Sequence, residues 1–218
     1  MQLDEVIRTA GTCRYFEERD VPDDVLERLF DAARFAPQGG NRQPVRFIVV
    51  RDAATKMRLR DWYLQPWSAY VRGVEEGRVA IGGEKARRAV SDADHMARSL
   101  DRIPVLVVVC AELDAITATD AKLDRVGMVA GASVYPAVQN LLLTARDLGL
   151  GAALTTLLVQ LEPQVRELLG IPDGVATAAM LAIGYPARPL LRKLSRRPVS
   201  EIVFSERYGR PLFASEGS

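Results

Sequence analysis

One uninterrupted apolar run constrains the fold of this chain more than any other segment. Residues 103–112 read IPVLVVVCAE, a stretch rich in β-branched side chains that meets no charge before Glu112. Such a run is typical of a strand buried on both faces, because a strand with one wet face alternates apolar and polar residues. We therefore expect a small sheet that is covered by helices.

The remaining segments alternate between helix and strand patterns. Strand patterns occur at residues 45–50, 151–157 and 176–186, the second of which reads as a short strand or a loop. Helical patterns occur at residues 3–9, 21–37, 53–100 with an interruption at IGGE, 122–148 and 162–170. The order α, α, β, α, α, β, α, β, α, β favours an α+β, α/β sandwich-like fold in which long helices cover a small mixed sheet.

The predicted helix at residues 122–148 contains a long uncharged stretch. Residues 126–145 carry no charged side chain over a length that is enough to cross a membrane. Gln139 and Asn140 would be costly in lipid, so a buried core helix is favoured over a membrane span. Pro136 is expected to kink or open this helix, and its apolar surface is expected to need cover from a second subunit.

Charge, cysteine and histidine usage exclude several classes of protein. The net charge of +1 gives no electrostatic footprint for nucleic acid. Cys13 and Cys110 form neither a metal-binding spacing nor a disulfide framework, and they fit a reduced, cytoplasmic setting. The single histidine, His95, excludes histidine-based metal clusters, and its neighbours Asp92 and Asp94 indicate a solvated helix face rather than a catalytic triad. No metal is therefore predicted.

The segment GLGAAL at residues 149–154 matches only part of a dinucleotide-binding fingerprint. Leu154 stands where the third glycine would be, and the segment follows a helix where the fingerprint follows a strand. The pattern instead predicts the end of a helix, with Gly149 in the left-handed cap.

Four scattered polar segments together contain the parts of a flavin mononucleotide (FMN) site. They are RTAGTCRYF at residues 8–16, QGGNRQ at 38–43, GAALTTL at 151–157 and the arginine-rich tail from residue 187. A phosphate is bound well by guanidinium groups. A flat ring with amide-like edges suits side-chain amides and backbone N–H groups, and its reduced form favours a nearby cation.

On these residues the chain resembles the nitroreductase family of flavin-dependent oxidoreductases. The resemblance runs from about residue 5 to residue 210 through RTAGTCRYFEERDVPDDVLERLFDAARFAP, GGNRQPVRFIVV, LLLTARDLGLGAALTTL with VRELLGIP and AIGYP, and RRPVSEIVFSERYG. It implies a single nitroreductase-like FMN-binding domain over residues 1–218, a homodimer with an extended C-terminal arm, and flavin sites that use residues from both subunits.

The resemblance also implies which residues bind the flavin. The N-terminal signature and the C-terminal arginines would hold the phosphate and one ring edge, the loop before residue 45 would lie beside the ring, and residues 154–156 would meet its reactive nitrogen. The implied cofactor-binding residues are Thr12, Cys13, Arg14, Pro37, Gln38, Gly39, Gly40, Asn41, Gln43, Leu154, Thr155, Thr156, Arg196 and Arg197. No catalytic residue is implied beyond these.

The chain departs from the family pattern at three positions. The two leading arginines of the N-terminal signature fall on Ala10 and Gly11, so the phosphate must depend on Arg14, Arg196 or a displaced Arg8. The residue after Pro37, where the family pattern has a serine, is Gln38. Four aromatic residues of the variable middle segment line a substrate pocket or pack between helices: Trp62, Tyr63, Trp67 and Tyr70.

The activity implied by the resemblance is reduction of electron-poor substrates by alternating half-reactions. NADH or NADPH would deliver hydride, and a nitroaromatic, quinone or enone would receive it. Three alternatives stay open: a flavin-binding or storage protein without turnover, a member that has lost flavin, and a flavin enzyme of the same fold with different chemistry.

Overall fold

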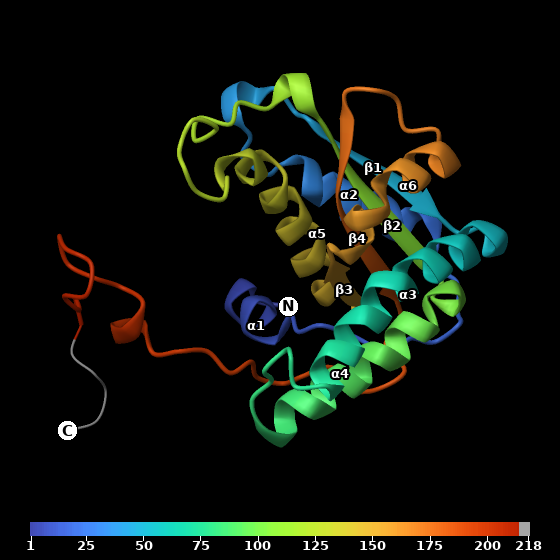
Figure 1. Cartoon of the computed structure of the whole chain (residues 1–218), viewed down its shortest axis with the longest axis horizontal. Coiled ribbons are helices and arrows are strands. Elements are labelled where there is room, and N and C mark those ends of the chain that lie inside the picture. Colours follow the sequence, from blue (N-terminus) through green and yellow to red (C-terminus); the bar gives the residue numbers. More distant parts are fainter. Residues whose placement is uncertain (214–218) are drawn as a thin grey trace.

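The structure, a computed structural model, describes residues 1–213 and is built on a four-stranded sheet (Figure 1). The strands are β1 (Val45–Val50), β2 (Val105–Glu112), β3 (Gly151–Thr155) and β4 (Val175–Gly184), in the spatial order β1-β2-β4-β3. All three strand pairs are antiparallel, whereas a mixed sheet was predicted. The parallel component is an isolated bridge between Thr12 and Ala152, at the outer edge of β3.

Strand β2 lies in the middle of the sheet and is buried on both faces, as its sequence predicts. Leu106 and Val108 belong to the hydrophobic cluster on one face of the sheet. Val105 and Val107 belong to the cluster on the other face. The alternation of a strand thus sends its apolar side chains into two separate cores, which explains why the run contains no polar interruption.

Helices cover both faces of the sheet. Helices α3 (Ala53–Glu75), α4 (Gly83–Arg98) and α6 (Glu162–Leu169) supply buried residues to the first core. Helices α2 (Asp23–Arg34) and α5 (Tyr135–Asp147) supply the second, and α1 (Leu3–Thr9) lies against α5. The predicted order of helices and strands is confirmed.

Local signals in the sequence account for several helix ends. The Asp52 side chain accepts a hydrogen bond from the Thr55 N–H and caps α3. Gly149 and Gly170 follow α5 and α6 with φ of +77° and +64°, the left-handed conformation that glycine adopts without strain. The prediction of a left-handed glycine cap at residue 149 is confirmed.

The predicted helix over residues 122–148 is wrong in its first half. Helix α5 begins at Tyr135, so Pro136 lies in its first turn and causes no kink, because that turn needs no proline N–H. Before it, Asp120 is buried and accepts hydrogen bonds from the N–H groups of Met128 and Val129. These bonds hold residues 120–129 in a loop and compete with a helix.

The segment after β4 leaves the body of the molecule (Figure 1, red). Its one short 3₁₀ turn in the described residues is Val199–Glu201, and it exposes the apolar side chains of Leu191, Val199, Ile202 and Leu212. In residues 1–213, no helix combines the length and the apolar composition that crossing a membrane requires.

Candidate functional site

The N-terminal part of the candidate site is attached to the outer edge of β3. The Cys13 N–H donates a hydrogen bond to the Ala152 carbonyl at 2.9 Å, beside the bridge of Thr12 to the same residue. The close approach depends on Gly151, because a Cβ there would lie 2.5 Å from Cys13 Sγ. Two segments of the predicted site, around Thr12 and around Leu154, are therefore brought together.

The edge of β3 is open beyond this attachment. Successive residues of a strand direct their backbone groups to alternate edges, so the N–H and C=O of Leu154 point outward like the carbonyl of Ala152. Within residues 1–213 neither group of Leu154 meets a hydrogen-bond partner outside the sheet. The strand thus presents one donor and one acceptor side by side, next to Thr12.

Thr155 is held from the opposite side by Tyr63 of α3. The Tyr63 hydroxyl lies 3.2 Å from Thr155 Oγ1, which also accepts the N–H of Leu157 at 3.3 Å. Burial raises the pKa of Tyr63, while the charge of nearby Arg14 acts in the other direction. Tyr63 therefore contacts Thr155, and no spacing in the sequence could indicate that contact.

The aromatic residues of α3 pack mainly inside the molecule. Tyr63 and Trp67 are buried and stack with ring centroids 6.4 Å apart, and Tyr70 packs against Trp67 at 5.4 Å. The Trp67 Nε1–H donates to Asp94 Oδ1 at 2.8 Å. For Tyr63 and Trp67, helix packing is thus the better of the two interpretations.

The loop from Pro37 to Gln43 is the second part of the candidate site and has an unusual backbone. Gly40, Asn41 and Gln43 have φ values of +59°, +52° and +52°. Positive φ is strained for a residue with a side chain such as Gln43, and such strain is concentrated at functional sites. Gln38 is partly buried, and none of residues 1–213 offers a hydrogen-bond partner to its Oε1 atom.

The loop at residues 37–43 is hydrogen-bonded to the segment that precedes α5. The Gly39 N–H donates to Ser133 Oγ at 3.1 Å, and Arg42 Nη1 donates to Thr117 Oγ1 at 2.7 Å. The segment that Asp120 holds by hydrogen bonds therefore also contacts the loop at residues 37–43. The sequence pattern did not predict this contact.

The two parts of the candidate site lie at opposite edges of the sheet. The loop leads into β1, whereas Thr12 and Leu154 lie at β3, and strands β2 and β4 separate the two. At a strand spacing of about 4.8 Å, the edges are about 14 Å apart with the buried core between them. A single chain does not bring the predicted residues around one ligand.

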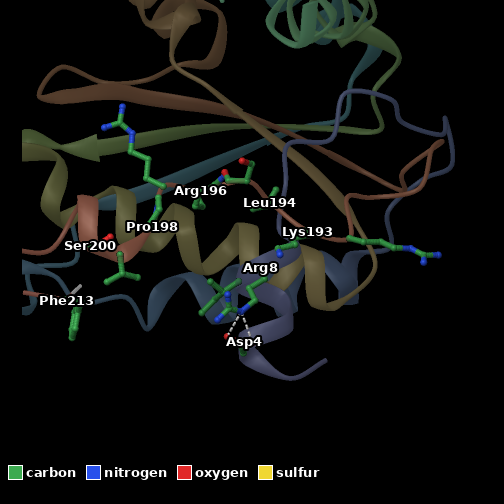
Figure 2. A pocket seen from close by; sticks show the side chains of 13 residues that line it. Asp4, Arg8, Lys193, Leu194, Arg196, Pro198, Ser200 and Phe213 are labelled. Carbon is green, nitrogen blue, oxygen red and sulfur yellow. Dashed lines mark hydrogen bonds and ion pairs between the residues drawn. The ribbon is translucent and has the colours of Figure 1, made fainter. Parts of the chain in front are cut away.

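The C-terminal arginines form a third part, beside α1. Leu194 N–H donates to the carbonyl of Arg8, and a cavity of about 1160 Å³ opens there (Figure 2). Its basic lining residues are Arg8, Arg192, Lys193, Arg196 and Arg197. Arg8 is paired with Asp4, as Figure 2 shows, and Arg196 donates to the carbonyl of Ser195. Thr12 and Arg14 line a different cavity of about 220 Å³.

Tyr15 anchors the N-terminal signature to α4 and to the C-terminal segment. Its hydroxyl donates to Asp92 Oδ1 at 2.6 Å, and its ring stacks on His95 at 4.5 Å between centroids. The guanidinium of Arg188 lies 3.3 Å from the centre of the same ring. Asp92 and His95 therefore contact Tyr15, whereas the sequence predicted that they lie on a solvated helix face.

The sequence profile described as the Nitroreductase family matches residues 7–185. This match covers most of the chain and agrees with the architecture described above. The chain belongs to the nitroreductase family. The resemblance stated from the sequence motifs is thereby confirmed.

Relatives of this nitroreductase-family chain carry different names. A Thermus thermophilus protein named NADH dehydrogenase is 31% identical over 182 residues, which cover 80% of this chain and 82% of the relative. Mouse iodotyrosine deiodinase 1 is 26% identical over 205 residues, covering 91% of this chain and 67% of the relative. Family membership therefore leaves the substrate open.

Two solved structures share the fold of this chain. A BluB-like flavoprotein from Clostridium difficile superposes with a TM-score of 0.71 at 24% identity, covering 95% of this chain and 100% of that chain. An iodotyrosine deiodinase bound to FMN and 3-iodo-L-tyrosine gives 0.69 at 24% identity, covering 91% and 96%. The nitroreductase-like fold predicted from the sequence is confirmed.

Proposed function

We propose that this chain is an FMN-dependent oxidoreductase that takes hydride from NADH or NADPH and reduces an electron-poor acceptor by alternating half-reactions. The observation that carries the proposal is the open edge of β3 at Leu154, with Thr12 beside it. Family membership and the relative named NADH dehydrogenase support it.

The residues at this edge fit a flat ring with amide-like edges. Leu154 offers a backbone N–H and C=O, and Thr155 offers a hydroxyl that Tyr63 holds in place. In the loop before β1, at the opposite edge of the sheet, the buried carbonyl oxygen of Gln38 calls for a donor. FMN, when bound, supplies the two-electron chemistry, and the chain itself binds and orients the reactants. Arg14 would place positive charge beside the ring, which favours its reduced, anionic form.

We further propose that the site is completed in a homodimer. The loop from Pro37 to Gln43 and the β3 edge lie too far apart in one chain, so a ring touching both needs the loop of a second copy. The exposed apolar side chains of the segment after β4, such as Ile202 and Leu212, would be covered in such an assembly. The remaining site residues, Cys13, Gly39, Gly40, Asn41, Thr156 and Arg197, keep their proposed flavin-binding roles.

A second candidate is reductive dehalogenation on the same bound flavin. It is favoured by the similarity to mouse iodotyrosine deiodinase 1 over 91% of this chain. The two candidates share the flavin site and differ in the acceptor. Release of halide from a halogenated phenol would indicate dehalogenation, whereas reduction of a nitroaromatic, quinone or enone would indicate the first candidate.

The test begins with the absorbance spectrum of purified protein after incubation with FMN and gel filtration. We expect a yellow dimer that NADH or NADPH bleaches without oxygen and that an electron-poor acceptor re-oxidises. A yellow protein that neither nicotinamide bleaches would be a flavin-binding or storage protein. A colourless protein would refute the proposed cofactor.

A further inference from the structure

Arg146 lies in the last turn of α5 and meets no anionic partner within residues 1–213. Its Nε–H donates to Thr9 Oγ1 at 3.0 Å, and the Thr9 hydroxyl donates to the carbonyl of Glu5. This pair of bonds fixes the plane of the guanidinium and leaves the N–H groups of both terminal nitrogens available. Among residues 1–213 no carboxylate lies within ion-pair distance of Arg146.

Two acids, one on α5 and one on α1, are paired with other cations. Asp147, the next residue, pairs with the amino group of Met1. Asp4 of the neighbouring helix α1 pairs with Arg8. Arg146 is half-buried, so its charge is partly removed from water without compensation by a protein anion. A charge in this state gains from an anionic ligand.

Arg146 lines a cavity at the candidate site. The cavity measures about 250 Å³, and its lining includes Thr12 and Leu154, two of the predicted flavin-binding residues. Its other lining residues are small or apolar, so Arg146 brings the only formal charge among the described residues that line it. The cavity therefore combines one guanidinium and one hydroxyl at the open edge of β3.

The C-terminal segment packs closely on Gly11. A Cβ at Gly11 would lie 3.0 Å from Leu191 Cδ1 and 3.1 Å from Leu194 Cδ2. A long side chain at residue 11 would displace these leucines from the C-terminal segment. The positive charge that the N-terminal signature lacks at Ala10 and Gly11 must then come from another element.

We propose that Arg146 of α5 supplies that charge and binds the phosphate of FMN together with the Thr12 hydroxyl. The proposal rests on the proposed flavin site and assigns it one more binding residue. It adds a second cation to the assignment of Arg196, which lines the separate large cavity beside α1.

The test compares FMN with riboflavin, which has the same ring and no phosphate. Apoprotein is titrated with each ligand, and flavin fluorescence reports the dissociation constants of the parent, Arg146→Gln and Arg146→Lys. Glutamine keeps a donor for Thr9 and removes the charge, whereas lysine keeps the charge and loses the fork. Arg34→Gln is the matched control, because Arg34 is exposed and paired with Asp31 on α2.

We expect Arg146→Gln to weaken FMN binding by about 10- to 150-fold, the loss of a charged hydrogen bond, and to leave riboflavin binding unchanged. Arg146→Lys should fall between the parent and the glutamine variant. Equal weakening of both ligands, or unchanged FMN binding, would overturn the assignment. A parent that binds neither flavin would instead refute the proposed cofactor itself.

Discussion

The contact between Gly151 and Cys13 allows a quantitative prediction. A Cβ at residue 151 would lie 2.5 Å from Cys13 Sγ and 2.6 Å from Cys13 Cβ. Carbon atoms pack at about 3.5–4.0 Å, so Gly151→Ala must move the segment around Cys13 by about 1 Å. Overpacking of this kind, with weakening of the Cys13–Ala152 hydrogen bond, should lower the free energy of unfolding by about 2–4 kcal/mol.

A double-mutant cycle isolates the contact. Cys13→Gly removes both clashing atoms, so adding Gly151→Ala to that variant should cost less than it costs in the parent, by about 1–3 kcal/mol. Urea unfolding at one fixed protein concentration measures all four proteins, because assembly would make stability depend on concentration. Gly127→Ala is the control, since a Cβ at that exposed residue would meet its nearest atom at 4.0 Å.

The refuting result is additivity. If Gly151→Ala costs the same with and without the Cys13 side chain, to within about 0.5 kcal/mol, the close approach is not what requires glycine at residue 151. The same displacement should shift Thr12, so Gly151→Ala is also expected to weaken FMN binding.

Three further outcomes are expected. Arg196→Ala should weaken FMN binding by about 10- to 150-fold, with little effect on riboflavin, through loss of a phosphate contact. Tyr63→Phe should lower the free energy of unfolding by about 0.5–1.5 kcal/mol in urea, because it removes the bond to Thr155, whereas Tyr70→Phe should not. Asp120→Ala should speed amide hydrogen exchange at Met128 and Val129. Hydrogen bonding from the Met128 N–H lowers the pKa of Asp120 in the folded protein. The carboxylate therefore contributes to the free energy of unfolding above its unfolded-state pKa of about 3.9, and this contribution is lost as the pH falls through the lower folded-state pKa.

Each expectation has a result that contradicts it. For Arg196, it is an equal loss of FMN and riboflavin. For Tyr63, it is a stability cost that persists when Thr155 has already been replaced by valine. For Asp120, it is protection of the Met128 and Val129 amides that is the same in the parent and in Asp120→Ala, or that survives acid after correction for the intrinsic exchange rate.

The fold could be read from the sequence because most of its signals are local. Strand β1 matches the predicted residues 45–50, and α1 matches residues 3–9. The error before α5 has a physical cause. Residues 126–134 are uncharged and mostly apolar. However, Asp120 accepts hydrogen bonds from the N–H groups of Met128 and Val129, and Gly131 lies against the ring of Tyr135, where a Cβ would come within 2.8 Å. Such contacts leave no periodic pattern in the sequence from which they could be predicted.

The candidate site was less accessible to sequence reasoning, because its contacts join distant residues. Thr12 and Leu154 matched known motifs, but no spacing could indicate that Tyr63 contacts Thr155 or that Arg146 and Thr12 line one cavity. The assignment of site residues by resemblance also left open how they are divided in space. The sheet order supplies that information, since it separates the loop before β1 from the edge of β3.

That separation has a genetic consequence. In the proposed dimer, one copy contributes the loop with Asn41 and the other contributes the edge with Arg14. A subunit altered at Asn41 and a subunit altered at Arg14 would each be defective when paired with their own kind. A mixed pair would hold one site altered on both sides and one site with every residue intact. Two defective alleles expressed together would thus complement each other, whereas two alleles altered on the same side would not.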